Sequence, residues 1–145
     1  MGERPTSVRL SPEMVETIVA HLREEYPNEG CGVILGDQSA AAGGQATRFK
    51  PMRNSAASRY RFLIDPMDVA ALDVELDETL ENYWAVVHSH VASEAYPSPT
   101  DVAANPLFVN QVHLVVSLAE DEPVLKAFWI VEGAIHAVEL LVGEG

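Results

Sequence analysis

The segment 84–101 reads WAVVHSHVASEAYPSPTD, an apolar run that ends in two histidines and is followed by a loop with two prolines. Its first four residues are apolar, which is typical of a buried strand. Because side chains two apart on a strand share a face, His88 and His90 are expected to point the same way. Zinc binds imidazole nitrogens and carboxylate oxygens, and the loop is long enough to bring Asp101 back to the histidines. Three protein ligands would leave a fourth position open, as in a catalytic zinc site.

The same residues also have a purely structural interpretation. Pairs of histidines two positions apart occur on protein surfaces and in hydrogen-bonded cores. Ser98-Pro99-Thr100-Asp101 has the form of a helix capping box, with Ser98 as the cap and Asp101 as the third helical residue. Local spacing alone therefore leaves both a metal site and an ordinary helix start open.

Length and composition predict one domain that spans residues 1–145. The chain has 145 residues, 48% of them hydrophobic, which is enough for a packed core. No apolar stretch approaches the roughly 20 residues that a membrane helix needs, and the first ten residues lack the apolar run of a secretory signal. The single Cys31 fits a reducing compartment. We therefore expect a cytoplasmic protein with no membrane partner.

The charge balance bears on the class of partner. Nine basic residues against 22 acidic ones give a formal net charge of −13. Such a surface repels phosphate backbones, which argues against a nucleic-acid partner. The acidic excess is spread along the chain, and it suits either solubility or the docking of a basic peptide.

The remaining pattern predicts a mixed α/β sandwich. One helix is expected to begin at Ser11-Pro12-Glu13 and to end at Pro27, and a second to follow Asp65-Pro66 over 67–80. A short helix is expected at 99–104. Strands are expected at 31–35, 47–52, 59–64, 84–90, 112–118, 124–131 and 135–142. Helices that alternate with groups of strands indicate a mixed, largely antiparallel sheet between helical layers.

Two segments resemble one known family. The spacing H-x-H-x7-S-x2-D from His88 to Asp101 resembles the signature of the JAMM (MPN+) metalloproteases. That family also has a glutamate just before an apolar strand, and PNEGCGVILG at 27–36 is similar to this element through Glu29. The resemblance extends over 54–66 and the closing strands. It implies a cytidine-deaminase-like (MPN) α/β/α sandwich, which agrees with the expected order of elements.

The resemblance implies a role for each matching residue. His88, His90 and Asp101 correspond to the ligands of a Zn²⁺ ion. Glu29 corresponds to the acid/base that handles the attacking water, and Ser98 to the hydroxyl that stabilises the oxyanion. A carboxylate beside the water can accept its proton and pass it to the leaving amine. A hydroxyl donor aimed at the oxyanion favours the transition state over the ground state.

The loop after the histidines is similar to one branch of the family. Val91 stands where many ubiquitin-removing members have proline, and Glu94-Ala95-Tyr96-Pro97-Ser98 resembles a compact bacterial branch. Members of that branch hydrolyse the bond between a ubiquitin-like sulfur-carrier protein and a C-terminal cysteine, in cysteine biosynthesis. The resemblance therefore implies a carrier that ends in Gly-Gly as partner and substrate.

Other functions remain as alternatives. An isopeptidase would remove such a carrier from lysines of target proteins by the same chemistry. A non-catalytic MPN scaffold usually lacks one or more ligands, and all are present in this sequence. A deaminase of the related fold would need a P-C-x-x-C pair, which the sequence does not contain.

The remaining chemically active residues are interpreted as structural. Cys31 is expected to be a small buried side chain in a strand rather than a nucleophile. His21 is expected to be an exposed helix residue. His113 and His136 lie on expected strands away from the motif, and neither is expected to bind metal.

Overall fold

The computed structural model describes residues 5–99 and 111–143. Its elements in chain order are β1 (Ser7–Leu10), α1 (Pro12–Glu25), β2 (Cys31–Gly36), the 3-10 helix η1 (Ala40–Ala42), β3 (Ala46–Met52), α2 (Pro66–Thr79), β4 (Asn82–His90), β5 (Val112–Ser117), β6 (Val124–Val131) and β7 (Ala134–Val142). No helix among the described residues is both long and apolar enough to cross a membrane.

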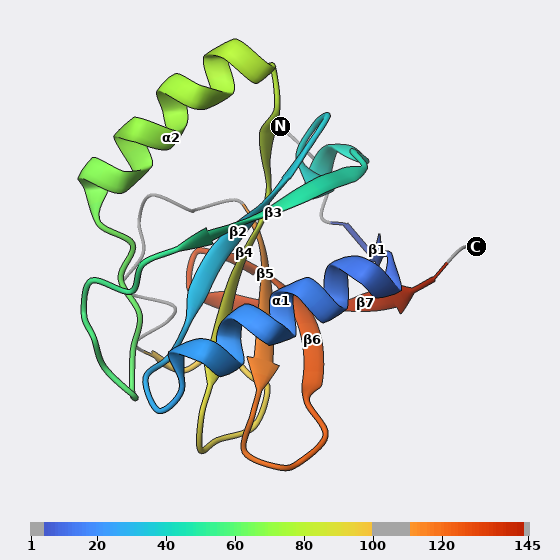
Figure 1. Ribbon diagram of the computed structural model, residues 1–145. Helices are drawn as coiled ribbons and strands as arrows, with labels where there is room; N and C mark the ends of the chain where they lie inside the picture. The colour runs from blue at the N-terminus through green and yellow to red at the C-terminus, as the bar shows by residue number, and fades with distance from the viewer. Residues whose placement is uncertain (1–4, 100–110, 144–145) are drawn as a thin grey trace.

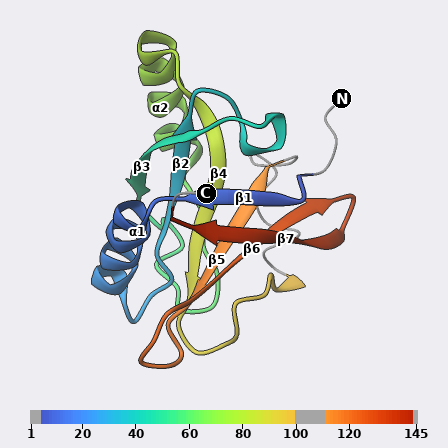
Figure 2. The ribbon, with the colours of Figure 1, turned by 90° about the vertical axis from the view of Figure 1, so that its right-hand side faces the viewer.

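The strands form one mixed sheet in the order β1-β7-β6-β5-β4-β2-β3. β1 pairs with β7 and β4 pairs with β5 in parallel, whereas the other neighbouring pairs are antiparallel. Figure 2 shows β1 and β7 running across the direction of β2 and β4, so the sheet is strongly twisted. The predicted mixed, largely antiparallel sheet is confirmed.

Helix α1 covers one face of the sheet (Figure 1). It begins as predicted, because the Ser11 side chain accepts a hydrogen bond from the Met14 amide and Pro12 occupies the first turn. Ile18, Val19 and Leu22 are buried on its inner side. They belong to one apolar cluster with inward-facing residues of β1, β4, β5 and β6, and burial of this apolar surface fixes the helix on the sheet.

Helix α2 packs on the opposite face, which completes the predicted α/β/α sandwich. The Asp65 side chain caps it by accepting from the Met67 amide. Three apolar residues of α2 pack against alternate residues of β2, namely Cys31, Val33 and Leu35. The neighbouring residue Ile34 belongs instead to the cluster under α1. The period of two along β2 thus divides its side chains between the two faces.

Two parts of the structure differ from the prediction. The predicted strand at 59–64 is wrong, since only Ile64 forms an isolated bridge, to Asn54. The Asn54 side chain instead occupies the backbone groups of this segment: its amide donates to the Arg61 carbonyl, and its oxygen accepts from the Leu63 amide. The sequence prediction also missed β1, a four-residue edge strand. The predicted helix at 99–104 lies, beyond Pro99, outside the described residues.

Candidate metal centre

The pairing of β2 with β4 brings two distant segments to the same place. Cys31 lies opposite His88 in the antiparallel ladder. One residue further on, the Ser89 amide donates to the Gly30 carbonyl over 3.0 Å, and the Gly30 amide donates to Ser89 Oγ over 2.8 Å. The pairing therefore continues beyond the ladder, and it sets Glu29 opposite the second histidine on the face that α2 covers.

Gly30 occupies a position where a side chain would not fit. A Cβ atom there would lie 2.9 Å from Leu22 Cδ2 and 3.2 Å from Glu25 Cβ, both on α1. Glycine therefore lets this segment run directly beneath the helix. A larger residue would push the segment away from α1 and displace Glu29.

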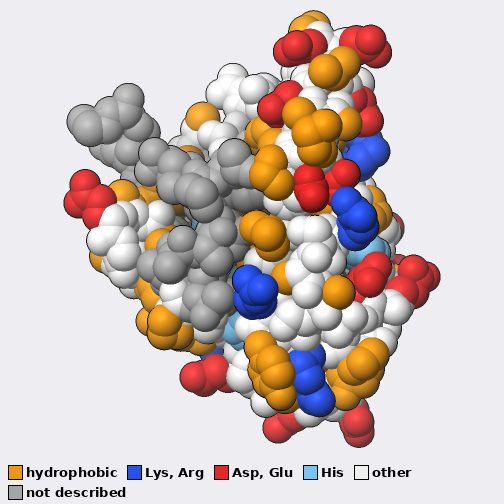
Figure 3. Space-filling view, turned by 90° about the vertical axis from the view of Figure 1, so that its left-hand side faces the viewer, with side chains coloured by type: hydrophobic (Ala, Val, Ile, Leu, Met, Phe, Trp, Pro, Cys, Tyr) orange, Lys and Arg blue, Asp and Glu red, His pale blue; other side chains and the backbone are white. Residues whose placement is uncertain are grey.

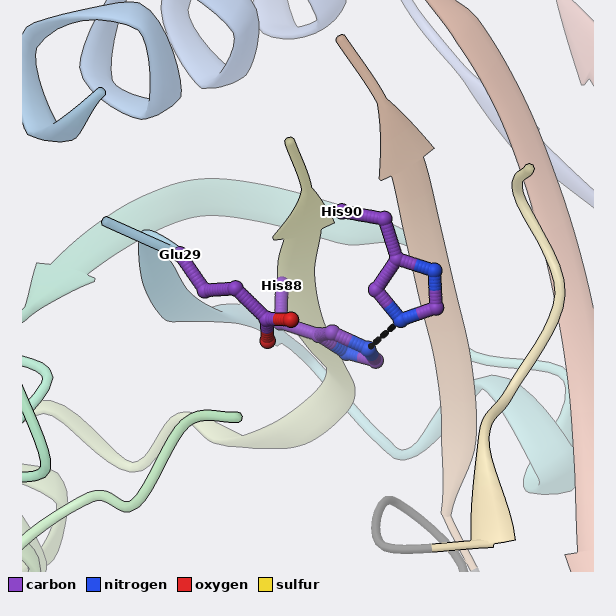
Figure 4. A group of neighbouring side chains, drawn as sticks. All are labelled: Glu29, His88 and His90. Atoms are coloured by element: carbon purple, nitrogen blue, oxygen red, sulfur yellow. Dashed lines mark hydrogen bonds between the residues drawn. The ribbon is translucent and has the colours of Figure 1, made fainter. Parts of the chain in front are cut away.

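Three buried side chains converge on this face. Glu29, His88 and His90 are 3%, 0% and 4% exposed. One potential ligand atom from each lies within 4.8 Å of the others, and Figure 4 shows the side chains pointing toward one another. The two histidine Nε2 atoms are 3.3 Å apart. Two nitrogens bound to one tetrahedral ion at about 2.0–2.1 Å are themselves about 3.3 Å apart, so these residues fit a single metal ion.

A hydrogen bond sets the tautomer of His90. Its Nδ1 atom lies 2.8 Å from the carbonyl oxygen of Glu94. Because a carbonyl only accepts, Nδ1 carries the hydrogen and Nε2 presents its lone pair toward His88. Metal-binding histidines commonly donate their other ring N–H to such an acceptor. The loop after β4 therefore orients His90 so that Nε2 faces the possible metal site.

The ring of His88 is held between apolar neighbours. Phe62 is 2% exposed and stacks on it, with ring centroids 4.3 Å apart and an interplanar angle of 16°. The partner of His88 in β5 is Val115, which is fully buried. These contacts restrict the rotation of the imidazole and keep water from one face of it. The site therefore has a low-dielectric wall beside the imidazole nitrogens.

Asn54 fastens the loop 55–63 to the backbone of Glu29. Its Nδ2 donates to the Glu29 carbonyl over 2.9 Å and to the Arg61 carbonyl over 3.0 Å. The Glu29 amide in turn donates to the Ser58 carbonyl over 2.8 Å. Asn54 lies in the stretch that resembles the JAMM family, but the resemblance implies no role for it. No local pattern around Asn54 marks this clamp, although buried polar groups are usually hydrogen-bonded.

The structure brings together part of the predicted constellation. Glu29, His88 and His90 meet as described above. Ser98 is half-buried in the loop after β4, and Asp101 lies outside the described residues. The roles assigned to Ser98 and Asp101 therefore stay predictions.

Cys31 lies beneath the site as a core residue. It is fully buried in the cluster under α2. Burial, together with the nearby carboxylates of Glu25, Glu29 and Asp68, raises the pKa of its thiol to about 12. A thiol in this state is neither a ready nucleophile nor a ready ligand. His21, predicted to be exposed, is half-buried, and its Nε2 lies 3.0 Å from the Cys31 carbonyl oxygen.

A family model described as prokaryotic homologs of the JAB domain matches residues 11–131. The chain belongs to this family. CysO-cysteine peptidases of Mycobacterium tuberculosis and Mycobacterium bovis are 32% identical to it over 127 residues, which cover 85% of this chain and 82% of theirs. The JAB-family chain is thus a homologue of JAMM-type peptidases, and its buried Glu29, His88 and His90 form a possible metal site.

Solved structures share the JAB-family fold. A Desulfitobacterium hafniense protein matches with a TM-score of 0.82 and 27% identity, over 94% of this chain and 93% of that one. A JAB1/MPN domain protein of Archaeoglobus fulgidus matches with a TM-score of 0.58 and 18% identity, over 94% of this chain and all of that one. The latter likeness concerns the fold alone, and it agrees with the predicted MPN-type sandwich.

Replacing either histidine of the pair should abolish metal binding. We expect the wild-type protein to hold about one zinc ion per chain after gel filtration, and His88→Ala and His90→Ala to hold almost none. His136→Ala, on β7, is the matched control and should retain the ion. Elemental analysis measures the zinc content of these proteins and of the His88→Ala/His90→Ala double variant. Full zinc retention by the His88→Ala/His90→Ala double variant would show that these residues are not ligands.

Cys31 should be dispensable for catalysis. Cys31→Ala should lose about 1–2 kcal/mol of stability, as is usual for a small change in a core, and keep its zinc and most of its turnover. A thiol reagent at pH 8 should label wild-type protein only after unfolding in urea, because the folded thiol is buried and protonated. A folded, zinc-loaded Cys31→Ala variant without activity would point to thiol chemistry instead.

Proposed function

We propose that the protein is a cytoplasmic, zinc-dependent peptidase of one domain, residues 1–145. Its substrate is a ubiquitin-like sulfur-carrier protein, from whose Gly-Gly C-terminus it releases a cysteine or a short peptide. The observation that carries the proposal is the convergence of Glu29, His88 and His90 in a buried group. Similarity to CysO-cysteine peptidases over 85% of the chain supports the choice of substrate.

Zinc is the ion that best suits these donors. Two imidazole nitrogens with carboxylate oxygen are usual in catalytic zinc sites, and we assign the third protein ligand to Asp101. When bound, zinc lowers the pKa of water and polarises the scissile carbonyl. His88 and His90 contribute fixed lone pairs for it, since Phe62 holds one ring and the Glu94 carbonyl orients the other.

Glu29 is assigned to proton transfer. Its carboxylate lies on the same face as the imidazoles, within reach of a water molecule placed between them. From this position it can take a proton from the attacking water and deliver it to the amine that leaves. The clamp from Asn54 holds the Glu29 backbone, which limits the motion of the carboxylate. Ser98 would donate a hydrogen bond to the oxyanion.

A groove near the site could receive an extended tail. A groove of about 280 Å³ runs between the end of β3 and α2 and includes Met52 in its lining. Met52 pairs with Cys31, which pairs with His88. Neighbouring strands are about 4.8 Å apart, so the backbones of Met52 and His88 are roughly 10 Å apart, with the fully buried Cys31 between them. β3 is an edge strand, and glycines suit a tail that pairs closely with such an edge.

The Glu29→Gln variant tests whether Glu29 acts as a general base or as a metal ligand. The amide keeps the size of the side chain but accepts no proton, so the variant should keep its zinc and lose at least about 10²-fold in kcat. Zinc content and turnover are measured on the same sample. Loss of the metal from Glu29→Gln would make Glu29 a ligand and leave the base unassigned.

The substrate is tested by comparing two bonds on the same carrier. The proposal predicts a higher kcat/KM for a carrier–cysteine amide than for a carrier attached to a lysine side chain. Mass spectrometry of the released products measures both reactions. Preference for the isopeptide would favour the alternative isopeptidase. Cleavage of neither by zinc-loaded protein would favour a scaffold.

A further inference from the structure

We infer that the exposed residues Arg59, Tyr60, Arg61 and Leu63 form a docking surface for an acidic face of the protein substrate. We call this surface the basic patch. The inference rests on the proposed function, because the patch would hold the folded body of a carrier whose tail enters the metal centre. It assigns specificity for a protein-sized, acidic partner to residues that take no part in the chemistry.

The basic charge of the chain is concentrated in one segment. Five of the nine lysines and arginines lie between positions 48 and 61, and the stretch 48–64 contains no aspartate or glutamate. In a chain with a net charge of −13, this is a strong local reversal of sign. Figure 3 shows basic side chains in the middle of the face below α2, with acidic side chains over the helix and around the rim.

Three of these five basic side chains form ion pairs within the protein. Arg48 pairs with Glu75 and Glu81, and Lys50 with Glu75. Arg53 similarly faces Asp65 and Asp68 of the α2 cap region. These contacts join β3 and the residue after it to α2 and its flanking residues, and the neighbouring carboxylates offset the three positive charges.

Arg59 and Arg61 differ from these three. Both are exposed, and within residues 5–99 and 111–143 neither forms an ion pair. Arg59 lies 5.7 Å from the centre of the Tyr60 ring, which is itself 75% exposed. Leu63 is 36% exposed beside them. An exposed tyrosine with two uncompensated arginines has the composition of a protein-binding surface.

The patch is fixed in place and borders the site. The segment that carries it is held by Asn54, which bonds to the backbone of Ala56, Arg61 and Leu63. Phe62, between two patch residues, stacks on His88. A partner that binds here loses little entropy in ordering the loop, and its flexible end lies close to the metal centre.

The other side of the site carries the opposite charge. A hollow of about 300 Å³ beside the loop after β4 has a net acidic lining, with three glutamates against one lysine: Glu94, Glu120, Glu122 and Lys126. The hollow includes residues of β5 and β6, whereas the loop that carries the basic patch bonds through the Ser58 carbonyl to Glu29, just before β2. An acidic partner is therefore repelled from one side and attracted to the other, which fixes its orientation over the site.

The test compares a large and a small substrate that present the same bond. One is the carrier–cysteine conjugate, and the other is a short peptide with the same Gly-Gly-Cys end. For Arg59→Glu/Arg61→Glu, kcat/KM for the conjugate should fall about tenfold or more, chiefly through KM, because attraction becomes repulsion. Cleavage of the peptide should stay within about twofold, which also shows that the variant is folded and metal-loaded. The loss in kcat/KM should shrink as salt rises from about 0.05 to 0.5 M, because salt screens the interaction between exposed charges.

Matched variants distinguish charge from other effects. Arg59→Lys/Arg61→Lys should retain most of the activity toward the conjugate. Arg9→Glu makes the same substitution at a single arginine on β1, the opposite edge strand of the sheet. It should have little effect on kcat/KM for the conjugate. Equal losses on both substrates, or an unchanged kcat/KM for the conjugate in the double glutamate variant, would overturn the docking surface while leaving the proposed function intact. Cleavage of neither substrate by wild-type protein would overturn both.

Discussion

The pair of hydrogen bonds between Gly30 and Ser89 is the constraint on which the site depends. Each residue donates its amide to the other, one to a carbonyl and one to a hydroxyl. Ser89, which lies between the two histidines, therefore has a structural role, because it binds the segment that carries Glu29. A slip of one residue in this pairing would turn Glu29 to the α1 face, away from both imidazoles.

The chemical character of the centre follows from its burial. A carboxylate and two imidazoles that face one another away from water are stable only when a proton or a cation lies among them. The hydrogen bond from His90 Nδ1 to the Glu94 carbonyl directs the other nitrogen of that ring inward. Apolar contacts of His88 exclude water from its ring. Burial of these three polar side chains without an ion would lower the stability of the protein. The same burial makes the group suitable for a divalent ion.

The sequence predicted much of this arrangement because its signals are local. The period of two places His88 and His90 on one face, and cap residues such as Ser11 and Asp65 mark both helices. Partner choice is not local: nothing in the 31–36 strand states that it pairs with β4. The order of the sheet and the contact of Glu29 with the histidines became apparent only from the resemblance and the fold.

The two errors have physical causes as well. The segment 59–64 is rich in aromatic and apolar residues like a strand, but a buried side chain, Asn54, takes hydrogen bonds that a partner strand would have made. β1 has four residues, too few for a period to be recognised. Only its parallel pairing with β7 in the structure identifies it as a strand.

Anomalous diffraction from crystals grown with zinc would test the central claim, that His88 and His90 jointly hold a metal beside Glu29. The account predicts one strong peak about 2.0–2.1 Å from the Nε2 atoms of both histidines, with an oxygen of Glu29 near it but no sulfur ligand. A peak bound to Cys31, or zinc bound only away from the histidine pair, would contradict it.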